Sequence, residues 1–223
     1  HYENMDGVEV FRFRYFWPTC LQALCNGPGI LPSLRTGFFP KSQVPALFAA
    51  EFFALRKLLA RKRFDAVNSH WMIPQGLTAA MNKRWVPFPH LLTIHSADIH
   101  TLHRVPGGSS LCRFVVSKSD RVITVSNHLH RLLEQTMDET VPVDVLPMGV
   151  KAEQFHVEAD RAGLKQAYGI TTQHAILFVG RLVEFKGIPY LLEAMTRIRE
   201  QADVTLIIAG SGPLRSVLEA KMQ

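Results

Sequence analysis

The sequence predicts an α/β protein with largely parallel strands, because short apolar runs and amphipathic segments alternate along most of its 223 residues. Segments 175–187 and 204–213 each begin with an apolar run that stops at glycine, and each is followed by a helical pattern. This order is typical of a sheet whose strand ends face a ligand. Hydrophobic residues make up 47% of the chain and charged ones 20%, which favours a packed globular protein over disorder.

The first part of the chain predicts a series of alternating strands and helices. The run Val8–Phe16 alternates as a strand would, and a turn-rich stretch follows from Pro18 to Pro45. Apolar residues then recur at helical spacing from Val44 to about Lys62. Further strands are expected at Asp65–Ser69, His90–Ile94, Arg121–Val125 and Val143–Leu146, and further helices at Pro74–Lys83, 109–118 and Ser126–Gln135.

The pattern weakens after Pro147 and restarts as a strand at Ala175, which we interpret as the passage between two domains. The first domain is expected at 1–147, the crossing at 148–168 and the second domain at 169–223. Helices 188–199 and Leu214–Met222 would flank the strand at 204–209. Two strands and two helices are too few to bury a core alone. We therefore expect both domains to be incomplete in this chain.

The charge of the chain is concentrated in its first part. The net charge is +6, and residues 1–63 carry nine Lys and Arg against four Asp and Glu. Such a basic region points to an anionic partner. Segment 55–64 interleaves five cations with apolar residues, so it could lie on an anionic membrane, or it could be a core-facing helix with a solvated basic end. The sequence holds no recognisable nucleic-acid recognition motif, so no nucleic-acid partner is expected.

The cysteines and the apolar runs favour a cytoplasmic protein. Cys20, Cys25 and Cys112 form no pair with metal-ligand spacing, and an odd number does not indicate a disulfide framework. No apolar run approaches the roughly 18 residues that a membrane-spanning helix needs. We expect a location in the cytoplasm, either free or peripheral on the cytoplasmic face of the membrane.

Two glycine loops carry the candidate residues for binding a phosphate. Gly180 and Gly187 bracket Arg181, whose guanidinium can contact two phosphate oxygens, and Lys186, which adds a second cation before a helix N-terminus. The alternative is a pair of solvated cations in an ordinary loop. The second loop, with Gly210, Ser211 and Gly212, could equally be a tight turn. Neither the dinucleotide fingerprint nor the P-loop pattern is present.

Two histidines stand at predicted strand ends in the first domain. His70 and His95 follow successive strands, and Ser96 and Asp98 lie next to the second of them. In an open α/β sheet this position faces the ligand crevice, although a structural role is the alternative for each histidine. No Asp-x-Asp and no His, Asp or Glu cluster with metal spacing occurs, so no metal is expected.

Six segments, in order, resemble the retaining glycosyltransferases of family 4, which have the GT-B fold. They are HWMIPQG, TIHSADI, VITVSNHL, VLPMGVKAEQF, ILFVGRLVEFKG and IIAGSGP, and they span about residues 65–213. The resemblance implies two facing Rossmann-like domains with parallel sheets. The first would bind the acceptor and the second a nucleotide-sugar donor, with no metal or other cofactor.

The resemblance also implies roles for individual residues. Arg181 and Lys186 match the cations that bind the donor diphosphate, and His95 matches a histidine near the sugar ring. His95, Arg181 and Lys186 are therefore the candidate catalytic residues. The remaining candidates are Gly180, Gly187, Gly210, Ser211 and Gly212 on the donor side, and His70, Gln75, Gly76, Ser96 and Asp98 on the acceptor side. Met148 departs from the family's usual Pro-Asn-Gly-Val motif.

The function implied is transfer of a hexose, with retention, from a nucleotide-diphosphate sugar to a glycan or lipid-linked acceptor in polysaccharide or cell-envelope glycan synthesis. Alternatives are another GT-B enzyme, such as a nucleotide-sugar epimerase or a phosphorylase, and a non-catalytic nucleotide-binding module. The family's first glycine-rich loop is expected before residue 1 and its Glu-x7-Glu motif after residue 223. Residues 1–223 alone are accordingly expected to be inactive.

Overall fold

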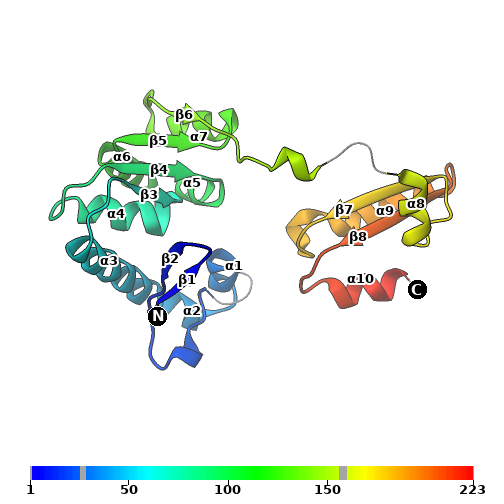
Figure 1. Cartoon of the computed structure of the whole chain (residues 1–223), viewed down its shortest axis with the longest axis horizontal. Coiled ribbons are helices and arrows are strands. Elements are labelled where there is room, and N and C mark those ends of the chain that lie inside the picture. Colours follow the sequence, from blue (N-terminus) through cyan, green and yellow to red (C-terminus); the bar gives the residue numbers. More distant parts are fainter. Residues whose placement is uncertain (1, 26–28, 156–159, 223) are drawn as a thin grey trace. The chain divides into compact units, whose positions relative to one another are not determined.

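The computed structural model describes residues 2–25, 29–155 and 160–222. They form two compact units, unit 1 (His1–Gly149) and unit 2 (Val150–Gln223) (Figure 1). Helices and strands alternate in both units, and the four-stranded sheet of unit 1 and the two-stranded sheet of unit 2 consist of parallel strands. The α/β class with parallel sheets is therefore confirmed.

Unit 1 contains a four-stranded parallel sheet in the order β3-β4-β5-β6. Because each strand pairs with the next one along the chain, all four carboxyl ends meet at one edge. In the register, His70 pairs with Thr93, and Ile94 pairs with Thr124. The strands are β3 (Val67–His70), β4 (His90–Ile94), β5 (Arg121–Thr124) and β6 (Asp144–Val145).

The largest hydrophobic core lies between this sheet and the helices that join its strands. Leu92 and Ile94 of β4 are fully buried, together with Val115 and Leu133 of the helices. The Ser126 hydroxyl accepts a hydrogen bond from the Leu129 amide at 3.3 Å and caps its helix, as the sequence predicts. The elements are a π-helical turn η2 (Met72–Gly76) and helices α4 (Leu77–Asn82), α5 (Ala97–Leu102), α6 (Gly108–Ser117) and α7 (Asn127–Met137).

The N-terminal part of unit 1 joins an antiparallel hairpin to short helices and one long helix. Leu59 of α3 is buried with Ala79 and Phe88, which anchors the long helix to the sheet side of the unit. The elements are β1 (Tyr2–Met5), β2 (Val8–Phe11), the 3₁₀ helix η1 (Thr19–Leu21), α1 (Ile30–Leu34), α2 (Phe38–Ser42) and α3 (Val44–Arg61).

Two sequence predictions in unit 1 were wrong in their extent. The strand expected at Val8–Phe16 ends at Phe11, because it pairs, among the described residues, with the short strand β1 alone, across the Asp6-Gly7 turn, where φ is positive at both residues. The helix expected at Pro74–Lys83 begins only at Leu77, because η2 occupies the preceding residues. The sequence analysis also missed β1, α1, α2 and α5.

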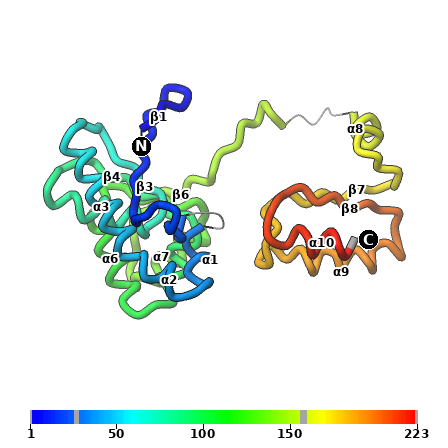
Figure 2. Tube along the Cα trace, turned by 90° about the horizontal axis from the view of Figure 1, so that it is seen from below, coloured from blue at the N-terminus to red at the C-terminus, as the bar shows by residue number. Residues whose placement is uncertain are grey.

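Unit 2 is built on two strands that run side by side (Figure 2). They are parallel, and Val179 lies opposite Ala209 in their register. Phe178 and Ile208 pack with side chains of two helices, whereas Leu177 and Val179, which alternate with Phe178, are exposed. The elements are the 3₁₀ helices η3 (Ala152–Gln154) and η4 (Glu184–Lys186), strands β7 (His174–Val179) and β8 (Val204–Ala209), and helices α8 (Arg161–Ala167), α9 (Ile188–Ile198) and α10 (Arg215–Met222).

Candidate functional site

The carboxyl edge of the unit 1 sheet brings the two predicted histidines together. His70 is the last residue of β3 and His95 follows β4 directly. Their rings stack with centroids 5.2 Å apart, and His70 Nδ1 lies 2.9 Å from His95 Nε2. The Trp71 ring is also nearly perpendicular to the His95 ring, with centroids 6.1 Å apart. Residues 25 positions apart in sequence thus form one polar pair at the end of two adjacent strands.

The neighbouring polar groups favour one arrangement of protons on the two histidine rings. The Thr93 hydroxyl donates to Asn68 Oδ1 at 3.1 Å, so the Asn68 amide nitrogen points to His70 Nε2, at 3.4 Å. With Nε2 accepting, the neutral His70 ring carries its proton on Nδ1 and donates to His95 Nε2. The neutral His95 ring is then protonated on Nδ1. His95 in this state presents a hydrogen-bond donor rather than a base.

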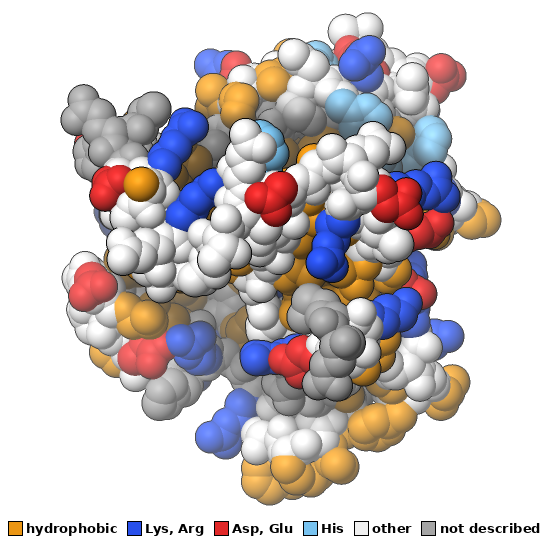
Figure 3. Space-filling model, turned by 90° about the vertical axis from the view of Figure 1, so that its right-hand side faces the viewer, with side chains coloured by type: hydrophobic (Ala, Val, Ile, Leu, Met, Phe, Trp, Pro, Cys, Tyr) orange, Lys and Arg blue, Asp and Glu red, His pale blue; other side chains and the backbone are white. Residues whose placement is uncertain are grey.

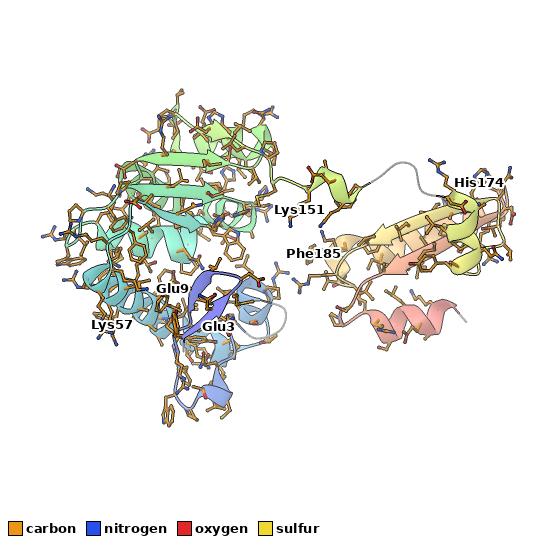
Figure 4. The ribbon with its side chains drawn as sticks, viewed as in Figure 1. Glu3, Glu9, Lys57, Lys151, His174 and Phe185 are labelled. Atoms are coloured by element: carbon orange, nitrogen blue, oxygen red, sulfur yellow. The ribbon has the colours of Figure 1, made fainter. Side chains whose placement is uncertain are left out.

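A cavity of about 840 Å³ lies beside this pair. It is bounded by the β1–β2 hairpin, α3, the length of β3 and the start of α4. His70, Trp71, Gln75 and His95 line it near the strand ends, and Lys57 and Arg61 of α3 also line it. Figure 4 shows Lys57 on α3. The volume is within the range of small-molecule sites.

Two polar side chains that line the cavity are partly shielded from solvent. Gln75 Oε1 is buried, and no described residue donates a hydrogen bond to it. Glu51 of α3 accepts a hydrogen bond from the Thr78 hydroxyl at 3.1 Å, and burial raises the pKa of its carboxyl group. Both groups can bind a ligand hydroxyl, and Gln75 Oε1 has an unused acceptor site.

Three other residues predicted on the acceptor side do not line the cavity. Asp98 is 8% exposed and its Oδ2 accepts a hydrogen bond from the Met72 amide at 2.6 Å, so it holds the turn after β3 in place. Gly76 is buried, and a Cβ there would lie 2.8 Å from Leu92 Cδ1. Ser96 is exposed at the start of α5, where its side chain makes no capping hydrogen bond.

In unit 2 the two glycine-terminated strand ends lie side by side. The Gly180 amide donates to the Ala209 carbonyl at 3.0 Å, and the Leu182 amide donates to the Ser211 carbonyl at 2.9 Å. A Cβ on Gly210 would lie 1.9 Å from the Gly180 carbonyl oxygen, and one on Gly212 would lie 2.4 Å from that of Leu182. These two glycines are therefore required by contact between the loops themselves.

The two predicted cations flank the turn that leads into α9. Arg181 is exposed directly after Gly180, and Lys186 is exposed at the end of η4. Gly187 has φ +71° and ends η4, so the amides of the first α9 turn follow immediately after Lys186. The Lys186 ammonium lies 5.6 Å from the ring of Phe185, a residue beyond β7 that Figure 4 labels. Two cations and a helix N-terminus suit an anionic group.

Segment 55–64 combines buried apolar residues with surface cations. Leu59 is 7% exposed and Leu55 packs against its cluster, whereas Lys57 and Arg61 are exposed. Lys62 of the same segment forms an ion pair with Glu9 of the β1–β2 hairpin. Glu9 is labelled in Figure 4. No helix within the described residues is long and apolar enough to cross a bilayer. The described residues also contain no group of three or more His, Cys, Asp or Glu side chains placed to hold a metal ion.

Comparison with known proteins identifies the family. The model of Glycosyltransferase Family 4 matches residues 6–154, and the model of Glycosyl transferases group 1 matches residues 173–223. Because the first match covers more than half of the chain, the protein belongs to glycosyltransferase family 4. The resemblance inferred from the six sequence segments is therefore confirmed.

Individual relatives agree with this assignment. An uncharacterized glycosyltransferase of Methanocaldococcus jannaschii, MJ1607, is 28% identical over 230 residues, covering 98% of this chain and 53% of that protein. The putative teichuronic acid biosynthesis glycosyltransferase TuaC of Bacillus subtilis is 28% identical over 161 residues, covering 70% and 40%. A GDP-mannose-dependent alpha-(1-6)-phosphatidylinositol monomannoside mannosyltransferase of Mycolicibacterium smegmatis is 26% identical over 117 residues, covering 52% and 31%. The chain spans about half the length, or less, of these relatives.

The sequence analysis missed three residues of the unit 1 site. Glu51 is the only acidic residue between positions 10 and 64, which is a signal that could have identified it. Asn68 and Trp71 flank His70 in the sequence, but neither residue type indicates a histidine contact by itself. Trp71 is placed by a backbone φ of +73°, an uncommon value for a residue other than glycine.

Proposed function

We propose that the protein acts in the transfer of a hexose, with retention, from a nucleotide-diphosphate sugar to a hydroxyl of a glycan or lipid-linked acceptor. Polysaccharide or cell-envelope glycan synthesis is the proposed setting, supported by relatives whose names refer to teichuronic acid and to phosphatidylinositol mannosides. The observation that carries the proposal is the His70–His95 pair beside a cavity of about 840 Å³ in a chain of family 4.

The acceptor would bind in unit 1 through hydrogen bonds to its hydroxyl groups. Gln75 Oε1 would accept from one hydroxyl, which relieves the cost of burying an unpaired polar atom, about 1–3 kcal/mol. Glu51 would accept from another. The His95 Nδ1 proton, available because His95 Nε2 is occupied by His70, would donate to a sugar oxygen. His95 thus serves in binding and polarisation rather than as a base.

The donor diphosphate would bind in unit 2. Negative charge grows on the leaving nucleotide as its bond to the sugar breaks, and groups that already point at it lower the barrier. Arg181, Lys186 and the first amides of α9 would supply that stabilisation. We propose that these cations neutralise the charge without a metal. Gly210 and Gly212 would act indirectly, by allowing the close packing that positions the loop of Arg181.

Binding of nucleotide diphosphates by residues 1–223 tests the donor assignment. Titration calorimetry with UDP and GDP should show binding of at least one of them. The double variant Arg181→Ala/Lys186→Ala should bind it about 100-fold more weakly, because two phosphate contacts are lost. Arg199→Ala removes an exposed cation from the opposite end of α9 and should bind normally. Equal binding by the double variant and Arg199→Ala would contradict the assignment.

Transfer itself is tested on residues 1–223 and on a full-length relative side by side, with labelled nucleotide hexoses and a mixed glycan and lipid acceptor pool. Nuclear magnetic resonance of the product gives its anomeric configuration, and an inverted configuration contradicts the proposed retention. Formation of hexose 1-phosphate from inorganic phosphate would instead indicate a phosphorylase. Interconversion of nucleotide sugars without an acceptor would indicate an epimerase.

A further inference from the structure

We propose that the indole ring of Trp71 is the surface on which a sugar or cyclitol ring of the acceptor stacks. The inference rests on the proposed function, because the stacked ring is part of the acceptor. It names the class of acceptor as a six-membered ring that carries hydroxyl groups around its edge and C–H bonds on at least one face. Trp71 follows His70 at the end of β3 and lines the cavity of about 840 Å³.

The backbone of Trp71 adopts a conformation that favours glycine. Its φ is +73° and its ψ is 142°. Among the described residues, the other two that combine a side chain with a positive φ are Asp6 and Asp138, and aspartate tolerates such values better than a bulky residue does. Strained residues of this kind concentrate at ligand sites, where the function requires a side chain in one particular place.

Hydrogen bonds on both sides of Trp71 hold its backbone in this conformation. The Trp71 amide donates to the Thr93 carbonyl at 2.8 Å, and the Trp71 carbonyl accepts from the Gly76 amide at 3.0 Å. The next amide, that of Met72, donates to Asp98 Oδ2 at 2.6 Å, and the Met72 side chain is fully buried. The Cβ of Trp71 therefore leaves the chain in a fixed direction.

Core packing does not account for a tryptophan at this strained position. The Trp71 side chain is 43% exposed, and it belongs to none of the four hydrophobic clusters of the described residues. Exposure alone does not single out Trp71, because hydrophobic side chains reach the surface at several separate places (Figure 3). The combination of strain, exposure and a position in the cavity does single it out.

The surroundings of Trp71 suit a ring with both apolar and polar sides. The negative face of an indole attracts the C–H bonds of a sugar or cyclitol ring, and hydroxyl groups at the edge of the same ring need hydrogen-bond partners. Gln75 Oε1 lacks a donor among the described residues, and the His95 ring lies nearly perpendicular to the Trp71 ring. Both residues line the same cavity. An open-chain polyol has the hydroxyl groups but lacks the rigid apolar face.

Nuclear magnetic resonance titration of residues 1–223 tests the inference. The probes are methyl glucopyranoside, methyl mannopyranoside and myo-inositol, with sorbitol as the open-chain control. At least one ring should bind and receive saturation mainly at the C–H protons of one face, and sorbitol should bind about tenfold more weakly or less. Trp71→Ala should weaken ring binding about tenfold, and Trp71→Phe, which keeps a smaller aromatic face, about threefold. Trp85→Ala removes a 50% exposed tryptophan outside the cavity and should bind normally.

The variant Trp71→Gly separates the role of the ring from the strain of the backbone. It should bind the rings as weakly as Trp71→Ala does, because both variants lack the indole. It should nevertheless unfold about 3 °C higher than Trp71→Ala, because glycine adopts a φ of +73° without a Cβ. Equal unfolding temperatures of the two variants would contradict the strain on which the inference depends.

The remaining outcomes distinguish the inference from the proposed function. Unaltered ring binding by Trp71→Ala, together with weaker binding by Gln75→Ala, overturns the inference and leaves the acceptor site in place. Absence of ring binding by the unaltered protein contradicts the acceptor site and the inference together. If Trp71→Phe binds as weakly as Trp71→Gly and the His95 resonances shift in both, Trp71 positions His95 instead of stacking on the acceptor. Thermal unfolding shows that each variant folds.

Discussion

His70 Nδ1 lies 2.9 Å from His95 Nε2, within hydrogen-bond distance, across two adjacent parallel strands. Because of this contact, the tautomer of one ring depends on the tautomer of the other. Asn68 contributes to this arrangement from the same strand as His70. The tautomer of His95 therefore depends on its neighbours His70 and Asn68, and this dependence can be tested directly.

We predict that the neutral His95 ring carries its proton on Nδ1. Long-range ¹H–¹⁵N spectra at alkaline pH should show His95 Nε2 unprotonated and His70 protonated on Nδ1. His70→Phe removes the donor, so His95 should revert to a mixture dominated by the Nε2-protonated form. An Nε2-protonated His95 in the unaltered protein would contradict the proton arrangement.

We predict that unit 1 becomes less stable as the pH falls below about 6.5, because His90 is buried in its neutral form. The pKa of His90 is lowered to about 4, mainly by burial and to a smaller extent by Lys83, while Asp120 opposes the shift. The unfolded chain takes up a proton below about pH 6.5 and the folded one does not until about pH 4. The free energy of unfolding should therefore decrease by roughly 3 kcal/mol across this window.

Urea unfolding followed by tryptophan fluorescence measures this effect, since Trp17, Trp71 and Trp85 all lie in unit 1. Substitution His90→Gln removes the titrating group and should flatten the dependence between pH 6.5 and 4. The buried ring contacts Ser69 and Ser119 through its two nitrogens, so some loss of stability at neutral pH is expected in addition. An unchanged slope in the variant would assign the effect to other groups.

We predict that Glu51→Gln stabilises unit 1 at neutral pH and weakens binding of an acceptor sugar. The raised pKa of Glu51 means that the folded state prefers the protonated form, so the unaltered protein gains stability as the pH falls toward the ordinary glutamate range. The amide is neutral at all pH values and should remove this gain. Urea unfolding at several pH values measures the first effect, and saturation-transfer resonance with a glycan panel measures the second. Glu134→Gln on α7 is the control.

We predict that Gly210→Ala prevents unit 2 from folding normally. The new Cβ would lie 1.9 Å from the Gly180 carbonyl oxygen, and backbone cannot yield as a side-chain tip can. A cost of about 3 kcal/mol or more is expected. Gly169→Ala, where φ is +65° but the space is open, should cost only about 1 kcal/mol. Amide hydrogen exchange of β7 and β8 compares the two variants, and equal protection in both would contradict the prediction.

Much of the fold could be read from local patterns. Strand β4 coincides with its prediction, and α3 and α9 differ from theirs by about one residue at an end, because apolar periodicity reports which face of an element is buried. The predictions that failed, at Val8–Phe16 and Pro74–Lys83, depend on what the segment pairs with. The short helices α1 and α2 were missed because Pro32 and Pro40 read as turn signals.

The candidate site shows the same division between local pattern and three-dimensional arrangement. The order of residues alone determines that His70 and His95 follow strands, and that Arg181 and Lys186 flank a glycine turn before a helix. Tertiary structure decides that the two histidine rings lie within hydrogen-bond distance, that Glu51 of α3 lines the same cavity, and that Asp98 accepts a hydrogen bond from the backbone. The physical reason is the separation in sequence over which each effect acts. Hydrophobic periodicity and turn chemistry depend on residues that are near neighbours in sequence. Ring contacts, burial and the resulting pKa shifts depend on which distant segments the packed sheet brings together.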